Sequence, residues 1–271
     1  MPDSRSVPPH GHASPAPAPG NDAQPLPDLA RLGLKAVVFD LDGVITRTAR
    51  VHAQAWTQLF NDYLRTRAVR DGTPFVPFET DDYLRHVDGL PRYDGVARFL
   101  RSRGIDLPRG TPDDAPDAET ICGLGNRKNL AFAHALREHG VEVFESSVRL
   151  VRALRARGVR TAINSSSRNA RPVLARAGLD DLFDAVVDGQ DAADDELRGK
   201  PAPDTFVRAA AAVGARPGEA AVFEDAVAGV AAGRAGGFAL VVGVDRGAGR
   251  QALAEAGADL VVNDLGAFPL E

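Results

Sequence analysis

The sequence has few of the features that mark secreted or redox-active proteins. Its 271 residues include one cysteine, Cys122, one methionine and one tryptophan. A single cysteine excludes an internal disulfide, and a lone thiol among polar residues is more often inert than catalytic. This cysteine usage is typical of a reducing compartment, so we expect the protein to be cytoplasmic.

Excess positive charge and long apolar runs are also missing. The formal net charge is -5 and the pI is about 5.7, which gives no basic field for a nucleic-acid backbone. No apolar run approaches the roughly 20 residues that a transmembrane helix requires. We therefore expect a monomer that acts on a small molecule, with neither nucleic acid nor a membrane as a partner.

The N-terminal residues 1–33 differ in composition from the rest of the chain. They are rich in proline, alanine and glycine, and such a composition buries too little apolar surface to offset the entropy lost on ordering. No apolar segment follows a basic start, so a secretory signal is not indicated. We predict a disordered tail here.

The first strong signal is an apolar run that ends on acids. Val37–Phe39 is followed by Asp40, Leu41, Asp42 and Gly43. Side chains two residues apart on an extended chain point to the same side, and glycine allows a sharp turn. The pattern predicts two carboxylates facing one small volume at the end of a buried strand. Taken alone, it is equally consistent with an acidic turn.

The spacing of apolar residues becomes helical after this strand. Val51, Ala55, Leu59 and Tyr63 recur on one stripe, which predicts an amphipathic helix. Further helices are predicted for Asp81–Val87, Tyr93–Arg103 and Asn126–His139. No convincing strand pattern interrupts them, so residues 48–138 are predicted to form an all-helical cap domain inserted after the first strand.

Strand and helix patterns alternate from Val141 onward. Short apolar runs without alternation are typical of strands buried on both faces, and helices between them imply a parallel sheet. Right-handed crossovers then give a doubly wound, Rossmann-like α/β fold. The predicted core comprises residues 34–47 and 139–271. Its later strands are Arg160–Asn164, Ala185–Asp188, Ala220–Phe223, Phe238–Val244 and Asp259–Val262.

Polar residues follow successive predicted strands, where ligands bind in such sheets. Ser165–Ser167 follow the second strand at a helix start, which suits an anion. Lys200 stands between Gly199 and Pro201, and Glu224 with Asp225 ends a later strand, which suggests a metal. Each feature alone is explained more simply, by helix caps or a solvated lysine. Their joint occurrence in this order favours a site for phosphate and a metal.

This set resembles the four motifs of the haloacid dehalogenase superfamily. The motifs are Asp40-Leu41-Asp42-Gly43-Val44, Ser165, Lys200 and Glu224-Asp225. The resemblance implies that Asp40 is the nucleophile and Asp42 the general acid and base. It also implies that Ser165 and Lys200 bind phosphoryl oxygens and that Mg²⁺ is held by Asp40, Asp42 through its main-chain carbonyl, Glu224 and Asp225. Asp42 looks like an aspartate that phosphatases and mutases have and dehalogenases lack, so dehalogenation is disfavoured.

The cap narrows the resemblance to the β-phosphoglucomutase family. The residues that look like that family's substrate-contacting positions are His52, Trp56, Gly89, Arg92, Lys128, Ser167 and Asn169. Two positions depart from the family pattern. Arg47 stands where an aspartate is common, and Asp88 precedes Gly89 where a lysine can occur.

The resemblance implies a Mg²⁺-dependent phosphotransferase that works through an aspartyl phosphate. Its reaction would convert β-glucose 1-phosphate to glucose 6-phosphate through the 1,6-bisphosphate. The alternative is a phosphatase for hexose phosphates or other small phosphate esters on the same scaffold. A more remote alternative is an inactive regulator that binds sugar phosphate. The complete set of acids argues against the regulator, because a binding protein has no need of Asp42.

Overall fold

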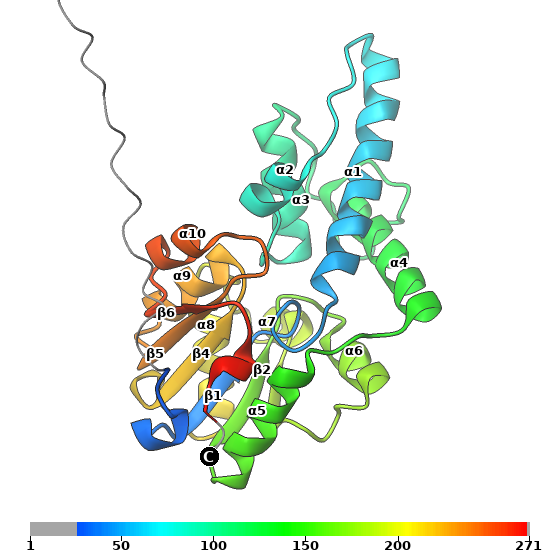
Figure 1. Cartoon of the computed structure of the whole chain (residues 1–271). Coiled ribbons are helices and arrows are strands. Elements are labelled where there is room, and N and C mark those ends of the chain that lie inside the picture. The colour runs from blue at the N-terminus through cyan, green and yellow to red at the C-terminus, as the bar shows by residue number, and fades with distance from the viewer. Residues whose placement is uncertain (1–25, 270–271) are drawn as a thin grey trace, which may run out of the picture.

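Six parallel strands form the centre of the larger part of the molecule (Figure 1). The structure, a computed structural model, describes residues 26–269. The sheet has the order β3-β2-β1-β4-β5-β6, which confirms the doubly wound parallel fold. Its strands are β1 (Ala36–Phe39), β2 (Arg160–Asn164), β3 (Ala185–Val187), β4 (Ala220–Glu224), β5 (Leu240–Val244) and β6 (Leu260–Val262).

The register of the central strands places their ends at one level. Phe39 of β1 lies opposite Ile163 of β2 and Phe223 of β4. The residues that follow these three positions therefore emerge side by side at the same edge of the sheet. This is the edge at which ligands bind in doubly wound folds.

Both faces of the sheet are covered by helices, because the strands are apolar on both sides. In β1, Val37 and Phe39 face one layer, whereas Ala36 and Val38 face the other. The first layer includes α5 (Glu145–Ala156) and α6 (Ala170–Ala177), and the second includes α8 (Asp204–Ala212), α9 (Val227–Ala235) and α10 (Arg250–Glu255). The short elements α7 (Gly189–Asp194), η2 (Pro217–Glu219) and η3 (Leu265–Ala267) lie in the connections.

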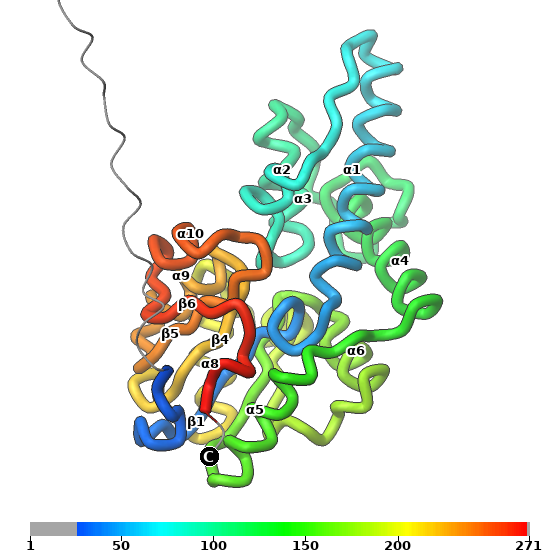
Figure 2. Tube along the Cα trace, in the orientation of Figure 1, coloured from blue at the N-terminus to red at the C-terminus, as the bar shows by residue number. Residues whose placement is uncertain are grey.

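Four helices between β1 and α5 form a cap with an apolar core of its own. They are α1 (Ala49–Asp71), α2 (Thr80–His86), α3 (Arg92–Ser102) and α4 (Ile121–His139). Phe60 lies at the centre of this core, with ring centroids 5.3 Å from Trp56 and 4.2 Å from Phe99. Figure 2 shows that the chain enters the cap after β1 and leaves it before α5.

Helix α4 begins at Ile121 rather than at the predicted Asn126. Thr120 caps it by accepting a hydrogen bond from the Gly123 N–H at 2.9 Å. The sequence did not predict this start, because Gly123 and Gly125 lie in the first turns and glycine disfavours helix. The structure gives a reason for them: a methyl group at Gly125 would lie 2.7 Å from the Tyr93 ring.

The N-terminal boundary of the core also differs from the prediction. Leu29–Leu32 forms a 3₁₀ helix, η1, and Leu29 is buried in the main core. The predicted tail over residues 1–33 therefore extends too far toward the core; its residues 1–25 lie outside the described part of the chain. Between residues 26 and 269, no helix has the length and apolar character needed to cross a membrane.

Candidate active site

Three buried carboxylates meet at the edge where β1 and β4 end. Asp40, Glu224 and Asp225 each offer an oxygen within 4.8 Å of the others. The turn after β1 makes room for them: Gly43 has φ +100°, and a methyl group there would lie 1.8 Å from Asp225 Oδ2. Only glycine combines this backbone conformation with such a close approach.

Lys200 is the cation that the chain itself places in this cluster. Its Nζ donates to Asp40 Oδ1 at 2.5 Å and to Glu224 Oε2 at 2.7 Å. The other carboxylate oxygen of Glu224 accepts hydrogen bonds from backbone N–H groups at 3.0–3.1 Å. Glu224 is thus fixed in orientation. Burial lowers the pKa of Lys200, but the two carboxylates outweigh burial and raise it above its usual value.

The cluster carries more negative charge than one lysine balances. Burial raises the pKa of Asp40 well above its usual range, and the charge of Glu224 raises it further. Burial likewise raises the pKa of Asp225, with added repulsion from neighbouring carboxylates. Crowded carboxylate oxygens with excess negative charge are the donor set that hard divalent cations prefer. The three carboxylates of the cluster therefore suit a divalent cation.

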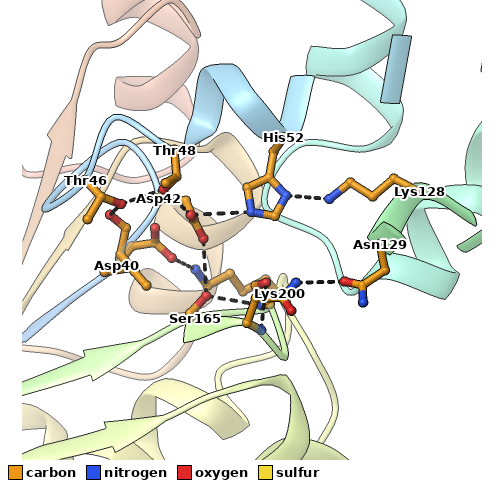
Figure 3. A network of polar contacts seen from close by, with 12 residues as sticks. Asp40, Asp42, Thr46, Thr48, His52, Lys128, Asn129, Ser165 and Lys200 are labelled. Carbon is orange, nitrogen blue, oxygen red and sulfur yellow. Dashed lines mark hydrogen bonds and ion pairs between the residues drawn. The ribbon is translucent and has the colours of Figure 1, made fainter. Parts of the chain in front are cut away.

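The carboxyl group of Asp42 lies between His52 of the cap and Ser165 of the core (Figure 3). It accepts a short hydrogen bond from Thr48, and its Oδ1 lies 3.4 Å from His52 Nε2. Burial raises the pKa of Asp42, but His52, Thr48 and other neighbours lower it more strongly, to about 2. Asp42 is therefore a carboxylate at neutral pH, ready to accept a proton.

His52 connects Asp42 to a buried lysine of the cap. Lys128 Nζ lies 2.5 Å from His52 Nδ1, and burial lowers the pKa values of both groups, that of Lys128 to about 7. Phe132 stacks on His52 at 3.9 Å, and Lys128 lies 4.9 Å from the Trp56 ring. We assign Nδ1 as the acceptor from Lys128, which leaves the Nε2–H of His52 directed at Asp42.

The loop after β2 supplies the third side of the site. Ser165 Oγ accepts from the Ser167 N–H at 3.1 Å, and Ser167 Oγ accepts from the Asn169 N–H at 3.1 Å. Ser165 Oγ also lies 3.4 Å from Asp42 Oδ2. The Asn169 side chain donates to Asn129 of the cap at 2.8 Å. This loop therefore contacts both the acids of the core and helix α4.

One cavity of about 280 Å³ between cap and core brings the predicted residues together. Its lining includes every residue that the sequence proposed for catalysis, substrate or metal: Asp40, Asp42, His52, Trp56, Gly89, Arg92, Lys128, Ser165, Ser167, Asn169, Lys200, Glu224 and Asp225. The carboxylates that approach one another within 4.8 Å include Asp40, Glu224 and Asp225 but not that of Asp42. A role for Asp42 toward a metal would therefore fall to its main-chain carbonyl.

The sequence interpretation missed several residues of the site. Thr48 precedes a helix and looks like an N-cap, yet its hydroxyl caps nothing and bonds to Asp42. Asn129, Arg168 and Tyr83 also line the cavity. The position of Thr48 three residues ahead of the helix stripe gives no signal of this role. Asn129 could have been suspected from its place beside Lys128.

The fold and site define an enzyme of the haloacid dehalogenase type, which comparisons with known proteins confirm. A model of the haloacid dehalogenase-like hydrolase family matches residues 34–237, so the chain belongs to that family. It is 52% identical over 236 residues to a protein named β-phosphoglucomutase from Mycobacterium bovis, covering 86% of this chain and 90% of that one. This confirms the resemblance to the β-phosphoglucomutase family.

Two further comparisons concern a phosphatase and a solved structure. The chain is 30% identical to validoxylamine A 7'-phosphate phosphatase of Streptomyces hygroscopicus subsp. limoneus, over 85% of this chain and 94% of that one. The crystal structure of a β-phosphoglucomutase from Clostridium difficile has a TM-score of 0.67 at 24% identity, covering 87% of this chain and 93% of that one. This structural likeness supports the fold.

The buried Lys128 leads to a prediction about stability. Its pKa of about 7 in the folded protein lies below the unfolded value of roughly 10.4. The unfolded state therefore binds more protons between these values, and this lysine makes stability rise with pH across that window, by at most about 1.4 kcal/mol per pH unit. We expect Lys128→Met to remove this rise and to be more stable than the wild type at pH 7.

Urea unfolding between pH 7 and pH 9.5 measures this effect as the difference between variant and wild type. Lys35→Met changes an exposed lysine and should leave the pH dependence of the wild type in place. An unchanged slope in Lys128→Met would show that Lys128 does not lose its proton in this range.

Proposed function

We propose that this enzyme is a Mg²⁺-dependent phosphotransferase that converts β-glucose 1-phosphate to glucose 6-phosphate through glucose 1,6-bisphosphate. The observation that carries the proposal is the separation of the two aspartates. Asp40 lies among the cluster acids with Lys200, whereas Asp42 is turned to His52 of the cap. A nucleophile and a proton carrier thus stand side by side in different electrostatic surroundings.

The cation would be held by Asp40, Glu224 and Asp225, with the main-chain carbonyl of Asp42. When bound, Mg²⁺ supplies positive charge that neutralises the phosphoryl oxygens. Lys200 and Ser165 would bind further phosphoryl oxygens, Lys200 through Nζ and Ser165 through Oγ. These groups reduce the repulsion between an anionic nucleophile and a phosphate ester.

Asp40 would form the covalent intermediate. One of its carboxylate oxygens attacks phosphorus, the acyl-phosphate bond forms, and the bond from phosphorus to the sugar oxygen breaks. Asp42, once it has been protonated, donates that proton to the leaving oxygen. The transfer is thereby divided into two steps, from sugar to Asp40 and from Asp40 to an acceptor.

The low pKa of Asp42 sets the order of proton transfer. With a pKa of about 2, Asp42 begins as a base. On the enzyme phosphorylated at Asp40, it would accept the proton of the sugar 6-hydroxyl as that oxygen takes the phosphoryl group. The protonated Asp42 then donates to O1 when the turned bisphosphate returns its 1-phosphate to Asp40, which leaves glucose 6-phosphate.

Contacts between cap and core favour transfer to a sugar over transfer to water. His52 lies against Asp42, Asn169 donates to Asn129, and Ser166 donates to the Gly89 carbonyl at 2.9 Å. A closed cap excludes water, so the aspartyl phosphate is not hydrolysed before a sugar acceptor binds. The catalytic base is also completed by the cap, because the His52 contact exists only when cap and core meet.

Arg92, Ser167 and Asn169 would hold the phosphate that is not being transferred. Arg92 begins helix α3 and lines the cavity. Its Nη2 donates to the Tyr93 hydroxyl at 3.1 Å, while its buried Nε has no partner within the described chain. A guanidinium with a free N–H suits a phosphate oxygen. His52, Trp56, Gly89 and Lys128 would line the remainder of the sugar site.

A phosphatase remains the second candidate function. It is favoured by the relative named validoxylamine A 7'-phosphate phosphatase, whose likeness covers 85% of this chain. The two functions use the same step at Asp40 and differ in the acceptor, a sugar hydroxyl or water. They can therefore be separated through the residue that would hold the second phosphate.

We expect Arg92→Ala to lower isomerisation of β-glucose 1-phosphate on the order of a hundredfold, because a charge-assisted pair with the distal phosphate is lost in the transition state. Hydrolysis of a small aryl phosphate should change little, since that substrate has no second phosphate. Initial rates on both substrates measure the effect.

Arg98→Ala, which alters another arginine on the same helix α3 that does not line the cavity, is the matched control. An equal loss of both activities in Arg92→Ala would assign Arg92 to general positioning of the cap. No loss of either would favour the phosphatase.

A further inference from the structure

Asp88 is a carboxylate of the cap that shares a cavity with the acids of the core. It follows α2 and lines the same cavity as Asp40 and Asp225. Burial raises the pKa of Asp88 to about 6, and the charge of Glu224 contributes to this rise. After burial, Asp88 is the neighbour that most raises the pKa of Asp225. The carboxylates therefore interact across the boundary between cap and core.

The loop that carries Asp88 is packed tightly on the core. Gly89 has φ +71°, and a methyl group there would lie 2.9 Å from Ala226 Cβ. The Gly89 carbonyl accepts from the Ser166 hydroxyl at 2.9 Å. A methyl group at Gly199 would lie 2.3 Å from Pro91 Cγ. These contacts hold the loop that carries Asp88 against the core while the cap is closed.

Asp88 is also fixed from the cap side. The Asp88 N–H donates to the Tyr83 carbonyl at 2.9 Å, and burial together with the charge of Asp88 raises the pKa of Tyr83. The positive charge of Lys200 lowers the pKa of Asp88, but Lys200 is already paired with Asp40 and Glu224. Closure of the cap therefore brings one more negative charge to a site that already has an excess.

The consequence depends on whether a cation occupies the acid cluster. Without one, a fourth carboxylate is repelled and closure is disfavoured. A divalent cation neutralises the two excess negative charges of the three carboxylates and Lys200, so the same carboxylate is no longer repelled. Asp88 is not among the carboxylates whose oxygens lie within 4.8 Å of one another, so it would act at longer range and not as a ligand.

We propose that Asp88 is a positioning residue that makes closure of the cap depend on a divalent cation in the acid cluster. The inference rests on the cation site of the proposed function. In the family pattern a lysine can precede Gly89, whereas this chain has Asp88 there. The proposal gives this difference a physical role. Because coupling is reciprocal, closure must strengthen cation binding as much as the cation strengthens closure.

Two measurements on the full-length protein test this coupling. The first is Mg²⁺ affinity by calorimetry for wild type, Asp88→Asn and Asp81→Asn. Removing the Asp88 charge should weaken Mg²⁺ binding on the order of tenfold, from the Coulomb energy of one charge at intermediate range. Asp81 lies on α2, is exposed and pairs with Arg85, so Asp81→Asn should bind Mg²⁺ as the wild type does.

The second measurement reports cap closure directly. Trp56 is the one tryptophan of the chain, is buried and lines the cavity, so opening of the cap exposes it to a neutral quencher such as acrylamide. Quenching in the wild type should decrease when Mg²⁺ is added. In Asp88→Asn, quenching should be low already and should not change with Mg²⁺. Asp88→Ser removes the same charge and should behave in the same way.

The outcomes separate the inference from its basis. A wild type that binds no Mg²⁺ would overturn the cation site and the proposed function with it. Mg²⁺ binding that is equally tight in wild type, Asp88→Asn and Asp88→Ser would overturn the inference alone. So would weaker binding in the variants combined with quenching that still depends on Mg²⁺, since Asp88 would then affect the site without governing the cap.

Discussion

Asp40→Asn should abolish turnover of sugar phosphates while the protein keeps its fold. The amide removes the nucleophilic oxygen and one anionic cation ligand, and it weakens the 2.5 Å pair with Lys200. We expect a loss of at least about ten-thousandfold, corresponding to more than ~5 kcal/mol in the barrier. The near-identical shape of the amide should preserve packing. Steady-state rates and circular dichroism measure both effects.

Asp245→Asn is the matched control for this substitution. Asp245 follows β5 as Asp40 follows β1, and its carboxylate accepts backbone hydrogen bonds from Gly247 and Gly249 at 3.0–3.1 Å. It does not line the cavity, so its amide variant should retain activity. Substantial turnover by a natively folded Asp40→Asn protein would show that Asp40 is not the nucleophile.

Asp42→Asn should have the next largest effect, and the effect should depend on the leaving group. Loss of the proton carrier should reduce turnover of sugar phosphates by on the order of a thousandfold, within the usual range for general acid and base catalysis. Asp42 is not among the clustered carboxylates, so Mg²⁺ affinity should be nearly unchanged. An aryl phosphate with an acidic phenol leaves without a proton, and its first transfer to Asp40 should remain fast.

A burst experiment resolves the two steps. Asp42→Asn should release about one equivalent of phenol per enzyme and then turn over slowly, because the aspartyl phosphate forms but no base activates its acceptor. Thr57→Ala, which changes an exposed residue of helix α1, should behave as the wild type. If sugar-phosphate turnover survived the Asp42 change, the proton would have to travel by another group.

The motif residues could be predicted because each depends on a short stretch of chain. Asp40 and Glu224 follow apolar runs directly, and a parallel sheet must bring the ends of neighbouring strands together. The register of β1 with β4 then places both carboxylates in one cluster. Local sequence and one rule of topology were sufficient for this part of the site.

The contacts across the cap could not be predicted in this way. Lys128 lies 76 positions from His52 in the sequence, yet its Nζ approaches Nδ1 to 2.5 Å. That pairing depends on how α4 packs against α1, which no local pattern encodes. The contact of Thr48 with Asp42 also depends on the fold, so in the sequence Thr48 looks like an ordinary helix cap. Asp88 stood out only as a departure from a family pattern, and its place in the cavity of the acids follows from the packing of Gly89 on Ala226.

Time-resolved phosphorus NMR of β-glucose 1-phosphate tests the central claim most directly. The sample contains the enzyme, Mg²⁺ and a trace of glucose 1,6-bisphosphate, which phosphorylates Asp40. A phosphotransferase that isomerises the sugar phosphate should convert the substrate resonance into that of glucose 6-phosphate with little free phosphate. Free phosphate as the main product, with no glucose 6-phosphate along the time course, would contradict the account and identify the enzyme as a phosphatase.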